Sequence, residues 1–182
     1  NCKQGLHNFF RQYFYFKSAD WKKNNPHLLK SWDTNELIKV PNYYIMDFNK
    51  SMPQTVEYIL PNNFKYKDSN WITEEDISVY CSHFKETGFQ GALNWYKAMY
   101  NQEQIDIISS LKLPENITIP SLFIAGKKDW GIYQKPHDFN IMKEKTLLNL
   151  IDASILDGAG HWVQQEQPKK VAEIILNFLN KT

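Results

Sequence analysis

The stretch GAGHWVQQEQP, residues 158–168, decides how the C-terminal part of the chain is interpreted. It places His161 on a short loop bounded by glycines, directly after the apolar pair Ile155 and Leu156. Glycine adopts turn conformations that other residues avoid, and Pro168 suits the first turn of a helix. A lone histidine in such a loop is more often structural than catalytic, so its role depends on other residues. The predicted helix has an apolar stripe at helical spacing, formed by Val171, Ile174, Ile175, Phe178 and Leu179.

An aspartate lies in the matching place after an earlier strand. The run IPSLFIAG, residues 119–126, is typical of a buried parallel strand, and Asp129 follows it. Catalytic groups collect at this edge of open α/β sheets. One helix within residues 136–150 would make the two strands neighbours, so Asp129 could accept the ring N–H of His161. Considered without His161, Asp129 also fits a structural role, as a loop carboxylate that forms an Asx turn and is solvated by Lys127 and Lys128.

The middle of the chain contains TGFQGALNWYK, residues 87–97. It follows a predicted helix that starts near Thr73, a candidate N-cap with acidic residues in the favourable first turn. The apolar stripe of that helix comprises Ile77, Tyr80, Cys81 and Phe84. Tyr96 then lies after two helix-breaking glycines. Composition alone favours a packing role for this tyrosine, because the chain has ten.

Three segments resemble the lid and C-terminal core of an epoxide hydrolase of the α/β-hydrolase fold. They are GFQGALNWY (residues 88–96), GKKDW (126–130) and GHWVQQEQP (160–168). The first and last are specific to the epoxide-hydrolase branch, whereas the middle one is widespread among α/β-hydrolases. Residues 7–57, with FRQYF at 10–14 and YYIMD at 43–47, resemble the first part of the same lid.

The resemblance implies a two-step reaction with three site residues from this chain. An aspartate nucleophile opens the epoxide to an alkyl ester, and water activated by His161 hydrolyses that ester. Asp129 orients His161, and Tyr96 donates to the epoxide oxygen. A donor aimed at a developing alkoxide stabilises the transition state more than the ground state. Tyrosine keeps its proton at neutral pH, whereas neutral imidazole can accept one.

Two departures from the family pattern matter. The second lid tyrosine is expected within residues 9–15, where Phe10 has the nearest register and Tyr13 and Tyr15 are displaced. The chain also contains no Gly-x-Asp/Ser-x-Gly nucleophile elbow and no His-Gly-x-Pro segment. We therefore expect the chain to be the C-terminal part of a longer protein, inactive without its nucleophile.

Composition limits the other classes of function. Hydrophobic residues make up 42% of the 182 residues and aromatic residues 15%, which suits a lid over an apolar pocket. A formal net charge of +1 argues against nucleic acid as the partner. No run is long enough to span a membrane, no signal peptide is visible, and cytosol is the default location. We expect no cofactor and no metal site, because the histidines and cysteines lack ligand spacing. The expected partners are a small hydrophobic epoxide and water, and a homodimer stays open.

The predicted organisation has two parts. Residues 1–100 form a mainly helical lid, with a polar loop at 62–63 and 65–70. Residues 101–182 form the C-terminal part of the core, beginning with a helix or linker at 102–112 in which Ile105, Ile107 and Ile108 can face inward. A strand at 119–125, a helix within 136–150, a strand near 153–157 and a helix at 168–180 follow. The fold class is therefore α/β.

Two other functions remain open on the sequence alone. One is a haloalkane dehalogenase or an esterase of the same fold, in which Trp95 could bind a halide or a serine would replace the aspartate nucleophile. The other is a non-catalytic fragment that binds apolar ligands. The residue at the centre of the elbow would separate the esterase, with serine, from the two enzymes with aspartate.

Overall fold

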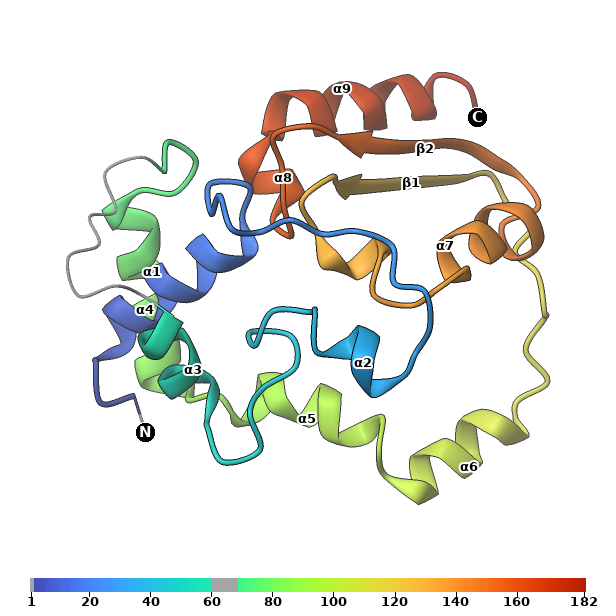
Figure 1. Cartoon of the computed structure of the whole chain (residues 1–182). Helices are drawn as coiled ribbons and strands as arrows, with labels where there is room; N and C mark the ends of the chain where they lie inside the picture. The colour runs from blue at the N-terminus through green and yellow to red at the C-terminus, as the bar shows by residue number, and fades with distance from the viewer. Residues whose placement is uncertain (1, 60–68) are drawn as a thin grey trace.

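The computed structural model describes residues 2–59 and 69–182. Helices make up the first part of the chain, and a pair of strands with flanking helices makes up the last part (Figure 1). The elements are, in chain order, α1 (Leu6–Lys17), α2 (Thr34–Leu37), α3 (Met52–Ile59), α4 (Glu74–Thr87), α5 (Gln90–Ala98), α6 (Gln102–Ser110), β1 (Ser121–Gly126), the 3-10 helix η1 (Trp130–Ile132), α7 (Asp138–Ile141), the π-helix η2 (Met142–Thr146), β2 (Leu150–Leu156), α8 (Val163–Glu166) and α9 (Pro168–Leu179).

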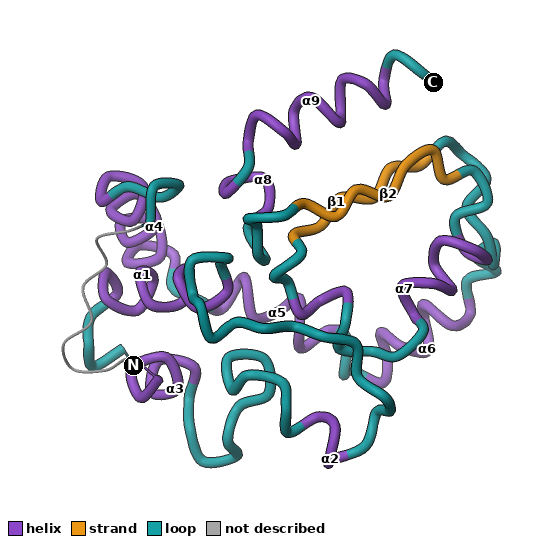
Figure 2. The backbone as a smooth tube through the Cα atoms, turned by 45° about the horizontal axis from the view of Figure 1, so that its top comes forward, coloured by secondary structure: helices purple, strands orange, loops and turns teal. Residues whose placement is uncertain are grey.

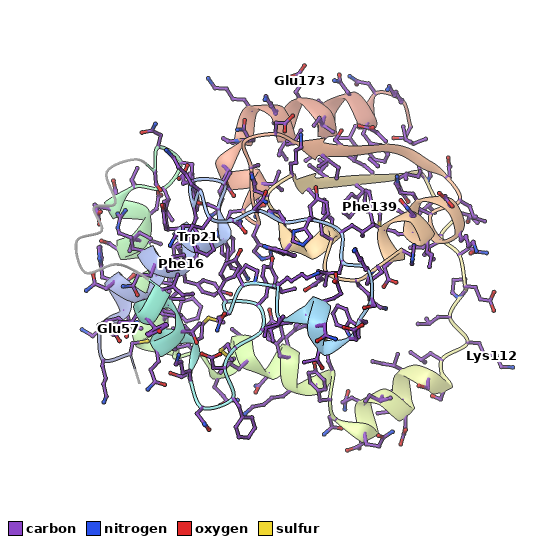
Figure 3. The ribbon with its side chains drawn as sticks, viewed as in Figure 1. Phe16, Trp21, Glu57, Lys112, Phe139 and Glu173 are labelled. Carbon is purple, nitrogen blue, oxygen red and sulfur yellow. The ribbon has the colours of Figure 1, made fainter. Side chains whose placement is uncertain are left out.

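The hydrophobic core of the described residues lies mainly in the helical part and is rich in aromatic rings. α1 packs against α3 and α4. The Phe10 ring of α1 lies 5.1 Å from Phe84 of α4, and Phe14 lies 4.8 Å from Tyr80. Figure 3 shows Phe16 and Trp21 on the same side of this part, and their rings meet edge to face at 5.0 Å. The buried members of the cluster are Phe9, Phe10, Phe14, Phe16, Leu29, Val40, Tyr43, Val56, Ile72, Ile77 and Trp130.

The predicted start and stripe of α4 are confirmed. Thr73 is its N-cap: the Thr73 side chain accepts from the Asp76 N–H, and the Asp76 side chain accepts from the Thr73 N–H. This reciprocal arrangement satisfies two amides that the first helical turn leaves free. Ile77 is fully buried, and the other three stripe residues pack against the aromatic core.

The last part of the chain is a strand–helix–strand–helix unit, as predicted. β1 and β2 pair in parallel, with Leu122 opposite Asp152 and Gly126 opposite Leu156. The helix expected within 136–150 is α7 followed by η2, and β2 begins earlier than predicted, at Leu150. α9 lies beside the two strands, as both views of the molecule show (Figures 1 and 2). The ring of Phe139 packs on Phe123 of β1 at 5.4 Å.

The inward orientation predicted for α6 is wrong. Ile105, Ile107 and Ile108 are 38%, 49% and 57% exposed. α6 lies apart from the strands (Figure 1), so the described residues leave its apolar side chains uncovered. Part of the apolar stripe of α9 is uncovered too: Val171 is buried, but Leu179 is 60% exposed.

Two further predictions concern a polar loop and a domain boundary. The polar loop predicted around residues 62–70 lies almost entirely outside the described residues, and the domain boundary at residue 100 stays a prediction. Within residues 2–59 and 69–182, no helix is long and apolar enough to cross a membrane.

Candidate active site

The two parallel strands end at the same edge of the sheet, and each is followed by one residue of the predicted pair. The loop after β1 is fixed to the loop after β2, because Lys127 N–H donates to Leu156 O and Lys128 N–H donates to Ala159 O, both at 2.9 Å. Asp129 then caps η1 by accepting the Gly131 N–H at 3.0 Å. Parallel pairing thus places the loops of Asp129 and His161 against each other.

The structure brings Asp129 and His161 together. Nδ1 of His161 lies 3.2 Å from Oδ1 and 3.3 Å from Oδ2 of Asp129. The Asp129 side chain is 15% exposed, whereas that of His161 is 36% exposed. Because a carboxylate only accepts, this contact favours the tautomer with hydrogen on Nδ1. Nε2 then carries the lone pair that a general base needs.

A third side chain, from the first half of the chain, completes this cluster. The hydroxyl of Tyr44 donates to Asp129 Oδ1 at 2.5 Å and lies 3.3 Å from His161 Nδ1. Burial opposes the charge on Asp129, but the hydrogen bonds from His161, Tyr44 and Gly131 together lower the pKa of the carboxyl. Burial, followed by the negative charge of Asp129, raises the pKa of Tyr44. The cluster therefore holds an ionised Asp129 beside a protonated phenol.

A buried lysine lies next to this cluster. Lys17, at the end of α1, is 8% exposed, and its Nζ donates to the Tyr13 hydroxyl at 3.1 Å. The Nζ atom lies 4.9 Å from the ring centres of Tyr13 and Tyr44 and 5.7 Å from that of Trp162. Burial lowers the pKa of Lys17, and the negative charge of Asp129 acts in the opposite direction. Aromatic faces partly replace the water that the ammonium has lost.

A buried amide fixes the Asp129 loop to the lid. Asn24, 1% exposed, donates to Lys128 O at 2.8 Å, next to Asp129. Its side-chain oxygen accepts the Tyr43 hydroxyl at 2.7 Å. Tyr43 directly precedes Tyr44, so one buried hydrogen-bond chain links the Asp129 loop to the segment that carries Tyr44.

Tyr96 is not part of this cluster in the described residues. It lies on α5 and is 61% exposed. The region expected to supply a second lid tyrosine supplies Tyr13, which contacts Lys17 rather than Asp129 or His161. Sequence reasoning missed Tyr44 as a site residue. The only signal was its place in YYIMD, residues 43–47, a segment that resembles the lid.

No group of three or more histidine, cysteine, aspartate or glutamate side chains within the described ranges could hold a metal ion. The cluster of Asp129, His161 and Tyr44 has acid–base character in its own right: an ionised carboxylate orients an imidazole whose second nitrogen accepts no hydrogen bond from any residue that the structure describes.

Comparison with solved structures defines the fold. A laboratory-evolved variant of potato epoxide hydrolase superposes on 98% of this chain, and on 47% of its own, with a TM-score of 0.68 at 23% identity. An epoxide hydrolase from an endophytic Streptomyces matches 61% of this chain and 32% of its own, at 36% identity and a TM-score of 0.54. The fold is thus that of the C-terminal part of an α/β-hydrolase with a mostly helical lid.

Curated relatives indicate which class of α/β-hydrolase the chain resembles. Epoxide hydrolase A of Mycobacterium tuberculosis is 36% identical over 110 residues, which are 60% of this chain and 32% of the relative. Epoxide hydrolase 3 of Siraitia grosvenorii is 34% identical over 120 residues, or 62% of this chain and 35% of the relative. No protein-family model matches the chain. The resemblance to epoxide hydrolases of the α/β-hydrolase fold is confirmed, and the chain spans about a third of the length of these two relatives.

Proposed function

We propose that this chain supplies the lid and the C-terminal part of the core of an epoxide hydrolase. The whole protein then hydrolyses a small hydrophobic epoxide to a diol. The observation that carries the proposal is the contact of His161 with Asp129 beyond the ends of two adjacent parallel strands. The names of the matched relatives support the epoxide as substrate.

The first step opens the ring. A carboxylate nucleophile, an aspartate supplied outside this chain, attacks one epoxide carbon. A C–O bond forms to the carboxylate while the C–O bond of the ring breaks, and the oxygen that leaves takes a proton from the Tyr96 hydroxyl. Support for Tyr96 comes from the resemblance of its segment, GFQGALNWY at residues 88–96, to the lid of epoxide hydrolases. A donor that meets the developing alkoxide lowers the barrier to ring opening.

The second step hydrolyses the ester. Nε2 of His161 takes a proton from water, and the oxygen of that water attacks the ester carbonyl. The ester C–O bond breaks, and the leaving alkoxide takes the remaining proton of the added water oxygen to give the diol, so that the nucleophile returns as a carboxylate. The proton held by His161 passes to the Tyr96 phenolate. Asp129 stabilises the imidazolium that forms on His161. The low pKa of Asp129 supports this role, because the carboxyl stays charged while the imidazole gains its proton.

Single-turnover kinetics with mass spectrometry on the whole protein test both steps. Tyr96→Phe should slow ester formation about 10- to 1000-fold, the range for the loss of one donor to an oxyanion. His161→Gln should leave ester formation intact but make the ester accumulate, because only hydrolysis needs the base. Tyr100→Phe is the control, since Tyr100 lies in the connection between α5 and α6 and is 87% exposed.

The same experiment separates the alternatives. An esterase would form its acyl intermediate on serine, and a dehalogenase would release halide from a haloalkane without opening an epoxide. Unchanged turnover in Tyr96→Phe would return this residue to a packing role. A His161→Gln protein without trapped ester would favour direct attack of water on the epoxide.

A further inference from the structure

A single carboxylate joins the His161 loop to the lid. Glu166, the last residue of α8, accepts hydrogen bonds from three main-chain amides. Ala19 N–H donates to its Oε2 at 2.8 Å, Gly160 N–H to its Oε1 at 2.9 Å, and Trp162 N–H to its Oε1 at 3.1 Å. Two of these amides belong to the residues on either side of His161, and the third belongs to the segment that follows α1.

The two segments that Glu166 connects, residues 160–162 and residues 17–19, are also in direct backbone contact. His161 N–H donates to Lys17 O, the last carbonyl of α1, at 2.8 Å. A Cβ atom on Gly160 would lie 2.7 Å from the carbonyl carbon of Ser18, so glycine lets the two backbones approach. The main chain of residues 160–162 is thus attached to residues 17–19 by hydrogen bonds and by close packing.

Glu166 has no cationic partner of its own in the part of the chain that the structure describes: its recorded partners are main-chain amides. Burial raises the pKa of this carboxyl, while the amides of Ala19, Gly160 and Trp162 act in the opposite direction. A carboxylate offers two acceptor oxygens and can serve three N–H groups at once. A glutamine offers one oxygen and turns its NH₂ group toward amides that need an acceptor.

We propose that Glu166 is a positioning residue for His161. It fixes the backbone on both sides of His161 to the end of α1, and thereby keeps Nδ1 within hydrogen-bond reach of Asp129. The inference rests on the proposed function only in taking His161 as the base. The placement of the imidazole can be measured whether or not the protein turns over an epoxide.

Glu166→Gln tests this role with little change in volume, and Glu166→Asp is the conservative variant. Glu173→Gln is the matched control, because Glu173 lies on the outer face of α9, pointing away from the strands (Figure 3). Two measurements on the full chain read the outcome. One is hydrogen exchange by mass spectrometry. The other is the NMR signal of the His161 Nδ1–H in histidine-labelled protein, assigned by its loss in His161→Gln.

In Glu166→Gln, exchange should accelerate at least tenfold in peptides covering residues 17–20 and 158–163, and stay unchanged in α4. The hydrogen-bonded Nδ1–H signal should weaken or disappear, Glu166→Asp should retain part of it, and Glu173→Gln should match the parent chain. In the whole protein, Glu166→Gln should accumulate the ester as His161→Gln does, with ester formation unaffected.

Two results would overturn the proposal. The first is an unchanged Nδ1–H signal with unchanged exchange around residue 161. The second is equal acceleration in every peptide, which would make Glu166 a general stability residue. Absence of epoxide turnover would count against the proposed function and not against this role, provided that the signal and the local exchange change as described.

Discussion

Replacing Gly126 by alanine should disrupt the junction that places Asp129 beside His161. Gly126 ends β1, three residues before Asp129. A Cβ atom there would collide with Gly160 O, and it would also lie 2.5 Å from Ala159 O and 2.6 Å from the carbonyl carbon of Ala159. Ordinary contact begins at 3.4 Å, so the backbone of the β2–α8 loop would have to move by about 0.9 Å or more.

The size of the effect follows from the kind of atom that the methyl group meets. Overpacking costs about 1–3 kcal/mol, and the upper end applies when backbone rather than a flexible side chain must move. The free energy of unfolding should therefore fall by about 3 kcal/mol. Gly91→Ala is the control, because a Cβ at Gly91, inside α5, meets nothing within 4 Å. Alanine should stabilise that helix by about 0.5–1 kcal/mol.

Urea unfolding followed by far-UV circular dichroism compares the two variants with the parent chain. The same substitution should lower the midpoint at one position and raise it at the other. The Nδ1–H signal of His161 should also change in Gly126→Ala only. A Gly126→Ala chain as stable as the parent would refute the claim that the close approach of these two loops holds the site together.

Two further predictions concern the side chains around Asp129. Lys17→Met should be about 1 kcal/mol more stable than the parent at pH 7, because it removes a buried ammonium without a carboxylate partner within 4 Å in the described residues. Burial lowers the pKa of Lys17, so the parent gains stability as pH rises from the folded-state pKa toward 10.5. The difference from Lys17→Met should therefore shrink over that interval in urea titrations. A constant difference, or one equal to that of the exposed-site control Lys22→Met, would contradict this prediction. Tyr44→Phe should lose about 1–3 kcal/mol of unfolding free energy at pH 7, since it removes a hydrogen bond to the charged Asp129. Tyr100→Phe should be neutral, and a Tyr44→Phe chain equally neutral would show that this hydrogen bond adds no stability.

Much of the C-terminal unit could be predicted because its signals are local. Apolar runs mark the two strands, glycines mark the loops that follow them, and Pro168 marks the start of α9. A parallel strand–helix–strand unit then brings the loops after both strands to one edge. The placement of Asp129 and His161 after these two strands, with one helix between the strands, was therefore enough to predict their contact, which the structure has at 3.2 Å.

The contribution of the lid could not be predicted in the same way. Tyr44 lies 85 residues from Asp129 and 117 from His161, and no periodicity connects the two regions. Its segment, residues 42–51, belongs to neither a helix nor a strand, so neither a helical nor a strand pattern marks which side of it faces the site. The inward orientation predicted for α6 was wrong for a different reason. Its apolar spacing was read correctly, but spacing shows which side of a helix is apolar and not whether a neighbouring element covers it.

The described residues combine a closed hydrophobic core with an uncovered apolar surface. The aromatic core around α1 and α4 is closed, with Phe16 and Ile77 almost completely buried. By contrast, large apolar side chains on and between α5 and α6 are exposed, among them Trp95, Met99 and Ile108. Apolar surface of this extent is unusual on an isolated soluble domain and is typical of an interface.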